Sequence, residues 1–468
     1  MAMRGKKVVL QNVRLENYAA EGKSLARVDG KVIFVENTIP GDVVDVFLRK
    51  NKKDWAEGVA VHFHAYSDQR VTPFCQHFGV CGGCQWQMLP YEKQLEYKQQ
   101  QVADNLTRIG KVALPPILPI LGATETRYYR NKMEYTFSPK RFLLPEELHN
   151  PNVSSEENVA GFHARGLFDK VVQIIKCHLQ PEPTNDLRLA VHDYARDQQL
   201  SYYDIKAHHG FLRTMQVRMA TTGEIMVNIV VGSNDKKKIE ALLNHLVQRF
   251  PQITTLLYTF NPKKNDSIFD LEPVVYTGKG YIIEQLESYR FKISPKSFFQ
   301  TNTRQGEALY RVARDFAELD GSQTVYDLYC GTGSIGIFVS SKAKKIIGVE
   351  MIDEAIRDAR ENATINNLSD AVFVTGDVVD ICNDNFFYEH GRPDVVITDP
   401  PRAGMHEKLV NKLLEIEAPT IVYVSCNPAT QARDLALLDE KYVVTRVQPV
   451  DMFPHTLHIE NVVQLKRR

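Results

Sequence analysis

The strongest constraint on the fold is an alternation of apolar strand-like runs and helix-like segments, which begins near residue 291 and continues to the C-terminus. The clearest unit is the run Thr324-Val325-Tyr326-Asp327-Leu328-Tyr329, followed by Cys330-Gly331-Thr332-Gly333-Ser334-Ile335-Gly336 and a helical pattern. This alternation predicts an α/β domain with a doubly wound, Rossmann-like sheet over residues 291–468. Because such sheets bind ligands in the crevice at the carboxyl ends of their strands, the residues after each strand are the candidate site.

The glycine loop and the next strand predict a ligand that contains a nucleoside. Glycines at a helix start let a ligand approach the backbone closely. The strand expected at 345–350 ends in Glu350, 19 positions after Gly331, where a carboxylate suits a ribose diol. Gly331, Gly333 and Gly336 also satisfy the dinucleotide pattern, so this evidence fits NAD as well as S-adenosylmethionine.

Two later strand ends favour S-adenosylmethionine over NAD. The run Val395-Val396-Ile397-Thr398 is followed by Asp399-Pro400-Pro401-Arg402, where the rigid prolines hold the acid over the crevice. Hydride transfer requires no such loop, whereas methyltransferases that act on bases commonly have an acid-Pro-Pro turn. The next apolar run, Ile421-Val422-Tyr423-Val424, leads into Ser425-Cys426-Asn427-Pro428, a polar turn that exposes the thiol. For Cys426 taken alone, the alternative is a buried cysteine that acts as a small apolar residue.

A cysteine and a downstream acid together predict methylation at carbon 5 of a uracil. Carbon 5 is a poor nucleophile, but a thiolate that adds to carbon 6 converts the ring into an enolate that can attack an activated methyl group. The proton on carbon 5 must then leave, which requires a general base on the opposite side of the ring. Glu460 is the candidate base, just before the last strand, expected at 462–465. The alternative is a surface glutamate at a strand entry.

The N-terminal residues 1–65 predict a small, OB-like β-barrel, because five short β-type runs alternate with turn signals. Within residues 1–62, eleven Lys or Arg stand against eight Asp or Glu, and a basic loop at 49–53 precedes Trp55. A basic loop beside an aromatic residue suits contacts to phosphates and bases. A solvated loop between two strands explains the same composition.

Residues 66–290 predict a central α+β domain with a metal site. Helical patterns lie at 91–106, 186–195 and 236–250, and strand-like runs lie at 214–219 and 225–231. The candidate ligands are Cys75, Cys81, Cys84 and the more distant Cys177. Four thiolates are compatible with tetrahedral zinc and with a [4Fe-4S] cluster. His77 and His178 are alternative ligands, although a histidine beside such a site more often lies outside the ligand set.

Composition narrows the partners and the compartment. The 468 residues contain 57 Lys or Arg and 57 Asp or Glu, so no global basic field marks a nucleic-acid partner, and RNA contacts must come from local patches. No run approaches the roughly eighteen apolar residues of a membrane helix, and the start, Met1 to Leu10, is basic without an apolar run behind it. Seven cysteines, an odd number, favour metal binding and catalysis in a reducing compartment. We expect a cytoplasmic monomer without membrane or DNA partners.

The combined motifs resemble those of the RNA uracil-5-methyltransferase family, in particular the 23S ribosomal RNA enzymes that carry a TRAM domain and a [4Fe-4S] cluster. The C-terminal motifs behind the resemblance are Ser297-Phe298-Phe299-Gln300-Thr301-Asn302, Asp327-Leu328-Tyr329-Cys330-Gly331-Thr332-Gly333, Asp399-Pro400-Pro401-Arg402, Ser425-Cys426-Asn427-Pro428 and His455-Thr456-Leu457-His458-Ile459-Glu460. The segments at 21–30 and 39–42 resemble a TRAM domain. The match covers nearly the whole chain.

The resemblance implies S-adenosylmethionine as methyl donor and a uridine of 23S rRNA, extruded from the RNA fold, as target. It implies Cys426 as nucleophile and Glu460 as base. It places five residues around the donor and the target base: Gln300, Tyr329, Glu350, Asp377 and Asp399. Cys75, Cys81, Cys84 and Cys177 fall on the cluster positions, which favours [4Fe-4S] over zinc.

Several alternatives stay open at this point. A transfer RNA uracil-5-methyltransferase would use the same chemistry. An iron-sulfur NAD oxidoreductase and an RNA-binding protein with an inactive catalytic domain are the alternatives from other classes. Tyr329 or Phe299 could stack on a base or on the adenine, or belong to the core. The stretch Gly166-Leu167-Phe168-Asp169 departs from the family's usual Ser-His before the fourth cluster cysteine.

Overall fold

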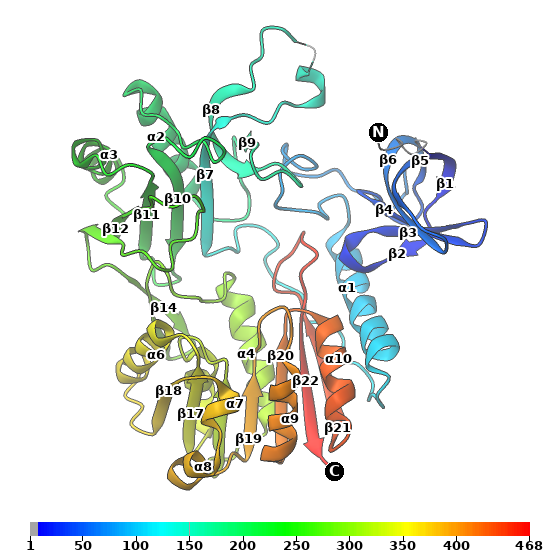
Figure 1. Ribbon diagram of the computed structural model, residues 1–468, viewed down its shortest axis with the longest axis vertical. Helices are drawn as coiled ribbons and strands as arrows, with labels where there is room; N and C mark the ends of the chain where they lie inside the picture. The colour runs from blue at the N-terminus through cyan, green and yellow to red at the C-terminus, as the bar shows by residue number, and fades with distance from the viewer. Residues whose placement is uncertain (1–7, 149) are drawn as a thin grey trace, which may run out of the picture.

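The computed structural model describes residues 8–148 and 150–468, which form four β-sheets (Figure 1). The first seven residues of the predicted N-terminal barrel, and with them most of the basic start, lie outside this part. In the described residues, no helix combines the length and the apolar character that crossing a membrane requires.

The N-terminal sheet has six strands in the order β1-β5-β6-β4-β3-β2. Their bounds are β1 Val9–Arg14, β2 Asn17–Tyr18, β3 Ser24–Val28, β4 Lys31–Glu36, β5 Val43–Asn51 and β6 Trp55–Ala65. The two-residue strand β2 is the one that the sequence did not predict. Alternate residues such as Ile33, Val35, Val44 and Val46 are buried in a small core of their own. Because no ladder joins the edge strands β1 and β2 in the described residues, closure into a barrel stays a prediction.

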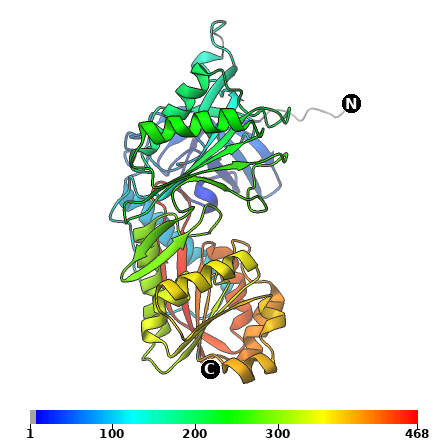
Figure 2. The ribbon, with the colours of Figure 1, turned by 90° about the vertical axis from the view of Figure 1, so that its left-hand side faces the viewer.

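The central sheet has seven strands in the order β13-β12-β11-β10-β7-β8-β9. The bounds are β7 Lys132–Lys140, β8 Glu156–His163, β9 Val171–Gln173, β10 Leu212–Met219, β11 Ile225–Val231, β12 Thr255–Phe260 and β13 Val274–Thr277. The helices α2 (Thr184–Asp197) and α3 (Lys236–Arg249) pack on it through Leu187 and Leu242, and α3 lies across the sheet in Figure 2. A separate hairpin, β14 (Ile282–Leu286) and β15 (Tyr289–Ile293), leads to the C-terminal sheet.

The C-terminal sheet confirms the predicted Rossmann-like α/β domain. Its order is β18-β17-β16-β19-β20-β22-β21, in which β16 to β20 are parallel and β22 is antiparallel to both neighbours. The strands are β16 Thr324–Leu328, β17 Lys345–Glu350, β18 Ala371–Thr375, β19 Val395–Thr398, β20 Thr420–Ser425, β21 Tyr442–Val450 and β22 Glu460–Arg467. Glu460 is therefore the first residue of the last strand and does not precede it.

Helices cover both faces of this sheet. They are α4 Thr303–Ala317, α5 Ser334–Val339, α6 Asp353–Ile365, α7 Val378–Ile381, α8 Asp384–His390, α9 Glu407–Ile416 and α10 Pro428–Leu438. Neighbouring strand residues face opposite cores: Val422 packs in the cluster with α4, α5 and α6, whereas Tyr423 packs in the cluster with α9 and α10.

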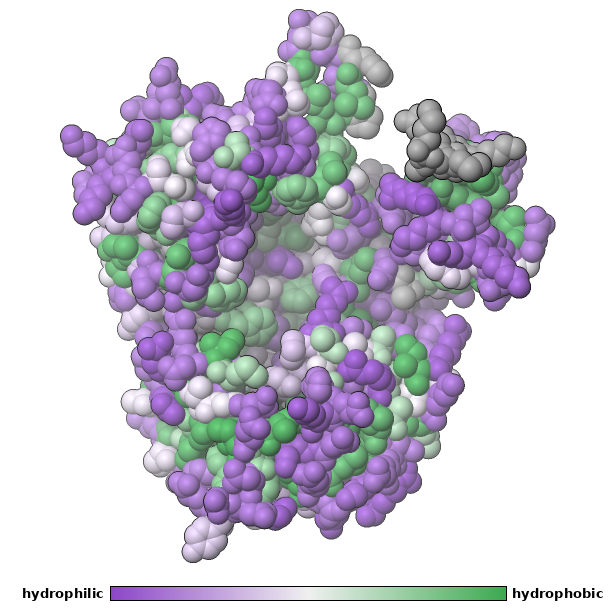
Figure 3. All heavy atoms as spheres, in the orientation of Figure 1, coloured by the Kyte–Doolittle hydropathy of each residue, from purple (hydrophilic) through white to green (hydrophobic). Residues whose placement is uncertain are grey.

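Helix α1 (Tyr91–Asn105) comes from the region predicted as central domain, but it packs on the C-terminal sheet. Its Val102 and the following Leu106 belong to the same buried cluster as Tyr423 and Leu435. Figure 1 shows α1 beside α10, and Figure 3 shows a recess on the same face between the two upper sheets and the C-terminal sheet.

Candidate functional site

Cys426 lies between the end of β20 and the start of α10. Asn427 caps that helix, because its side-chain oxygen accepts a hydrogen bond from the backbone amide of Ala429 at 3.1 Å. The Asn427 Nδ2 atom donates to the carbonyl of Arg402 at 3.1 Å and so ties the cysteine turn to the acid-Pro-Pro loop. The thiol itself is half-buried. The turn thus holds the thiol at the carboxyl edge of the sheet, beside the loop that carries Asp399.

Two carboxyl groups share the surroundings of this thiol. Burial raises the pKa of Cys426 to about 12, and the negative charges of Glu460 and Asp399 contribute to the rise, while Arg402 opposes it. Burial also raises the pKa of Asp399 to about 7 and lifts the pKa of Glu460 well above its usual range. The charge of Asp399 raises the pKa of Glu460 further. The thiol is consequently protonated at neutral pH, and the two acids hold protons more tightly than exposed carboxyls do.

Asp327 belongs to the same group of acids. In the sequence it is part of the glycine-loop motif and was not predicted as a site residue. It lies in β16 with 1% of its surface exposed. Its Oδ2 atom accepts a hydrogen bond from the backbone amide of Gly336 at 2.8 Å, while Oδ1 has no partner within the described residues. Burial raises the pKa of Asp327 to about 7, and the charges of Asp399 and Glu350 add to the rise. An acid near the end of the strand before a glycine loop is the signal that could have identified it.

A cavity of about 350 Å³ brings together Tyr329, Glu350 and Asp377, three of the predicted site residues. The Glu350 carboxylate spans the glycine loop and the next turn: Oε2 accepts from the Gly331 amide at 3.2 Å, and Oε1 accepts from the Ile352 amide at 3.0 Å. The volume lies in the range of small-molecule sites. These three side chains can therefore contact one bound ligand.

Backbone conformation keeps the glycine loop open to such a ligand. Gly331 has φ +52°, and a Cβ atom there would meet nothing within 4 Å, so the space in front of the loop is free of protein atoms. A Cβ atom at Gly333, with φ +76°, would approach the Phe373 ring to 2.8 Å. Tyr329 has φ +59°, an unusual value for a bulky residue at the end of a strand.

Gln300 and Asp399 do not line this cavity. Gln300 is buried just before α4, and its carbonyl accepts a hydrogen bond from Asn131 Nδ2 at 2.8 Å. Its neighbour Phe299 is 3% exposed and packs in the core, so Phe299 is not available for stacking on a base or on an adenine. Phe298, which the sequence did not single out, is 68% exposed instead.

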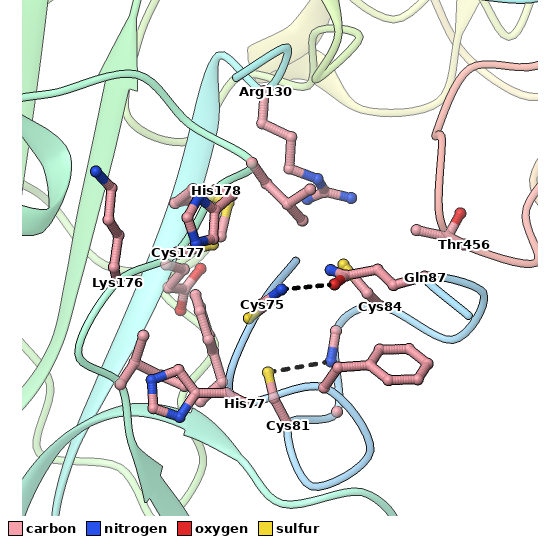
Figure 4. A pocket seen from close by; sticks show the side chains of 18 of the residues that line it. Cys75, His77, Cys81, Cys84, Gln87, Arg130, Lys176, Cys177, His178 and Thr456 are labelled. Carbon is pink, nitrogen blue, oxygen red and sulfur yellow. Dashed lines mark hydrogen bonds between the residues drawn. The ribbon is translucent and has the colours of Figure 1, made fainter. Parts of the chain in front are cut away.

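The four candidate metal ligands line one cavity of about 370 Å³, shown in Figure 4. Cys75, Cys81 and Cys84 come from one loop, and Cys177 comes from the segment after β9. The Gly83 amide donates to the Cys81 sulfur at 3.4 Å. Burial raises the pKa of Cys81 to about 11 and that of Cys84 to about 12. Without a bound group these thiols are therefore protonated at neutral pH.

The four thiols are not gathered into a metal-binding group. Over the described residues, no three or more His, Cys, Asp or Glu side chains lie close enough together to hold one metal ion. Tetrahedral zinc and a [4Fe-4S] cluster both require four ligands, so the arrangement does not favour one of the two over the other. His77 Nε2 already accepts a hydrogen bond from the Ile175 amide at 2.9 Å, and His178 Nδ1 lies 3.2 Å from the Tyr128 hydroxyl. Both histidines are thus engaged by protein groups.

The basic stretch predicted as a loop at 49–53 lies partly in strand β5, which extends to Asn51. Lys50 forms an ion pair with Glu57 at 2.8 Å, and Arg49 lies 3.4 Å from Glu36. Both cations are thus paired within their own sheet. Trp55, at the start of β6, is exposed and available for stacking.

Comparison with known proteins assigns the chain to a family. Residues 273–468 match the family described as tRNA (Uracil-5-)-methyltransferase. A Bacteroides thetaiotaomicron protein named an uncharacterized RNA methyltransferase is 52% identical over 453 residues, which cover 96% of this chain and 100% of that protein. A Porphyromonas gingivalis protein of the same name is 49% identical over 97% of this chain and 99% of its own length.

One solved structure also resembles the whole chain. The Pyrococcus abyssi tRNA (uracil-54, C5)-methyltransferase in complex with S-adenosyl-L-homocysteine is 27% identical, with a TM-score of 0.74. The match covers 97% of this chain and 100% of the archaeal one. The protein therefore belongs to a family of RNA methyltransferases, and its residues 273–468 match the tRNA (Uracil-5-)-methyltransferase family.

Proposed function

We propose that the protein transfers a methyl group from S-adenosylmethionine to carbon 5 of a uridine in RNA, through a transient bond between Cys426 and carbon 6. The observation that carries this proposal is the electrostatic cluster of Cys426, Glu460 and Asp399 at adjacent strand ends. Membership of the methyltransferase family supports this reaction over the two alternatives from other classes, an NAD oxidoreductase and an inactive RNA-binding protein.

The reaction runs in three steps. The thiol of Cys426 loses its proton to a carboxylate of the cluster, and Sγ adds to carbon 6 of the extruded uracil. Carbon 5 then attacks the donor methyl group, the donor's sulfur–methyl bond breaks, and S-adenosylhomocysteine is released. Glu460 removes the proton on carbon 5, the Sγ–carbon 6 bond breaks, and the free cysteine is restored.

The cavity at the glycine loop is the proposed donor site. Glu350 would bind the ribose hydroxyls and Asp377 the adenine, with Tyr329 between them. Gln300 and Asp399 would lie toward the methyl group and the target base. The S-adenosyl-L-homocysteine bound by the archaeal relative supports this assignment.

For the cysteine cavity we propose a [4Fe-4S] cluster held by Cys75, Cys81, Cys84 and Cys177. Four thiols line one cavity of about 370 Å³ and offer the donor set of such a cluster. The cluster would cross-link two distant segments and could transfer an electron. Methyl transfer needs no electrons, so a role in folding or in RNA positioning follows.

We propose 23S rRNA as the substrate, because the motifs resemble those of the 23S rRNA enzymes. The N-terminal unit would act as a TRAM-type RNA-binding barrel. The division into units 1–65, 66–290 and 291–468, the monomeric state and the cytoplasmic location belong to the same proposal. Transfer RNA is the second candidate, because the structurally similar archaeal enzyme acts on tRNA uridine 54.

One experiment tests both the chemistry and the substrate. RNA that contains 5-fluorouridine should trap a covalent complex, since no proton can leave carbon 5. The wild-type protein should form this complex with a 23S rRNA fragment, and a Cys426→Ala variant should not. Equal trapping by Cys426→Ala would exclude the proposed nucleophile. If a deletion strain loses 5-methyluridine only from tRNA, the substrate is tRNA and the proposal of 23S rRNA is wrong.

A further inference from the structure

The loop between β21 and β22 connects the proposed base to distant parts of the chain. Residues 451–459 join the two strands, and Val450 faces Glu460 in the ladder where the loop begins and ends. Figure 1 shows this loop rising from the C-terminal sheet between α1 and the central sheet. Any displacement of the loop is therefore transmitted to the strand end that carries Glu460.

A buried ion pair fixes the first residue of this loop, Asp451. Lys98 Nζ of α1 lies 2.6 Å from Asp451 Oδ1, and both side chains are 0% exposed. The Tyr91 hydroxyl donates to Asp451 Oδ2 at 2.8 Å, and Lys98 also donates to the Phe453 carbonyl at 3.2 Å. The second carboxylate oxygen is thus bonded as well, as a buried charge requires. Helix α1 is anchored one residue away from the Val450–Glu460 pair.

The tip of the loop is held at His455 from two directions. Gln94 of α1 forms two hydrogen bonds with it: the His455 amide donates to Gln94 Oε1 at 2.8 Å, and Gln94 Nε2 donates to His455 Nδ1 at 3.1 Å. The His455 carbonyl accepts from the amides of Gln85 at 2.8 Å and Trp86 at 3.1 Å. Gln85 directly follows the candidate ligand Cys84. The loop tip therefore joins α1 to the cysteine-rich segment.

His455 adopts a strained conformation at this junction. Its φ is +65°, in the left-handed region that histidine rarely occupies, and the residue is only 6% exposed. Such a conformation persists where the surrounding contacts determine it. Burial lowers the pKa of His455 to about 4, so the ring is neutral and Nδ1 can accept the Gln94 hydrogen bond. The hydrogen bonds to Gln94, Gln85 and Trp86 are the contacts that compensate the strain.

We propose that Gln94 is a positioning residue for Glu460. It acts through His455 and, together with the cysteine-rich segment, clamps the 451–459 loop so that the Glu460 carboxyl is held against carbon 5 of the bound uracil. This inference rests on the proposed role of Glu460 as base. Gln85 and Trp86 of the cysteine-rich segment bind the carbonyl of His455. The segment would thus help to position the base, a task that requires no electron transfer.

The test replaces Gln94 by leucine, which retains bulk but not the hydrogen bonds. The control is Gln100→Leu on the exposed face of the same helix, where the side chain donates a hydrogen bond to Asp104 at 3.1 Å. On the full-length, cluster-loaded protein we expect Gln94→Leu to lower kcat about tenfold or more, because small misplacements of a catalytic group are costly. The KM for S-adenosylmethionine should not change. The methylated RNA–protein adduct should accumulate, since removal of the carbon 5 proton becomes slow.

Hydrogen exchange supplies a readout that does not depend on activity. Peptides that cover 451–459 should exchange faster in Gln94→Leu than in the wild type, while peptides of β20 should be unchanged. The Gln100→Leu control should match the wild type in kcat, adduct and exchange. Should Gln94→Leu not fold, His455→Gly carries the same expectations, because glycine adopts the left-handed φ but offers no imidazole.

The outcomes separate this inference from the proposed function. Wild-type turnover by Gln94→Leu, beside a Glu460→Gln variant that accumulates adduct, would overturn the clamp alone. A fall in kcat without adduct and without faster loop exchange would also overturn it. Normal turnover by Glu460→Gln would instead overturn the proposed base, and the clamp with it.

Discussion

The charge of Asp399 raises the pKa of Glu460 beyond what burial alone produces, so the two carboxyl groups titrate as a pair. Asp399 itself has a pKa of about 7. Burial and mutual repulsion thus make both carboxyls hold their protons more tightly than exposed acids do. A group that must take the proton from carbon 5 has to be ionised first, which links the reaction rate to pH.

We expect kcat to rise with pH over a range above that of an ordinary carboxyl, because burial and Asp399 raise the pKa of the base Glu460. Asp399→Asn removes the neighbouring charge, lowers the pKa of Glu460 and should move the rise to lower pH. Single-turnover methyl transfer between pH 5.5 and 9 measures the shift. Asp384→Asn, at an exposed acid of α8, is the control and should leave the profile unchanged. An identical profile for Asp399→Asn would contradict the coupling.

Asp327 should destabilise the fold as the pH rises. Its folded pKa of about 7 lies above the unfolded value, so its favourable contribution is complete below the unfolded pKa and is lost as pH rises through 7. Asp327→Asn should therefore raise the free energy of unfolding by about 2 kcal/mol more at pH 8 than at pH 5. Urea titrations at both pH values test this. Asp320→Asn should show no difference between the two pH values, because hydrogen bonds from Ser322 lower the pKa of that exposed acid, which is therefore ionised at both.

Lys98→Met should leave the Asp451 carboxylate buried without its partner. We expect a loss of about 3–5 kcal/mol in the free energy of unfolding, as for other broken buried pairs. Adding Asp451→Asn should restore part of the loss. The matched control is Lys93→Met on the same helix, whose pair with Glu96 at 2.5 Å is exposed to solvent and should contribute little to stability. A loss in Lys98→Met no larger than in the control would contradict a role for the pair.

Phe298 and Phe299 should respond in opposite ways to alanine. Phe299→Ala opens a cavity in the core and should cost about 3–5 kcal/mol of stability. Phe298→Ala should leave the unfolding midpoint unchanged but raise the KM for RNA about fivefold, because stacking on a base contributes about 1–3 kcal/mol. Unchanged RNA binding by Phe298→Ala would show that the exposed ring does not contact the substrate.

Removal of one cavity thiol should prevent binding of the proposed cluster. Cys177→Ser is expected to lose iron, sulfide and visible absorbance together, since each cluster requires four thiolates. Cys382→Ser, at a buried cysteine outside the cavity, should retain all three. A wild-type protein that binds one zinc ion and no sulfide would contradict the assignment.

Much of the fold follows from local patterns. The run predicted at 345–350 is β17 and the run predicted at 225–231 is β11, with the same bounds, because strand-forming residues and turn signals act over a few neighbours. The placement of Cys426 at a strand end has the same origin. The glycine loop likewise pointed to the cavity proposed for the methyl donor, since its φ values are a property of short sequence.

Other features depended on contacts between remote residues. The antiparallel insertion of β22 between β20 and β21 is a matter of strand pairing across the chain, and no local pattern announces it. Which of Phe298 and Phe299 faces the core follows from the direction of the chain as it leaves β15.

The sequence by itself determined the type of the elements with clear apolar patterns and indicated candidate residues for the chemistry, because both depend on side-chain identity and short spacing. Only the tertiary structure decided that α1 packs on the catalytic sheet and that Gln94 meets His455, 361 positions further along the chain. The reason is physical: hydrogen bonds and buried charges are satisfied by whatever partner packing brings near, and that partner is set by the whole fold.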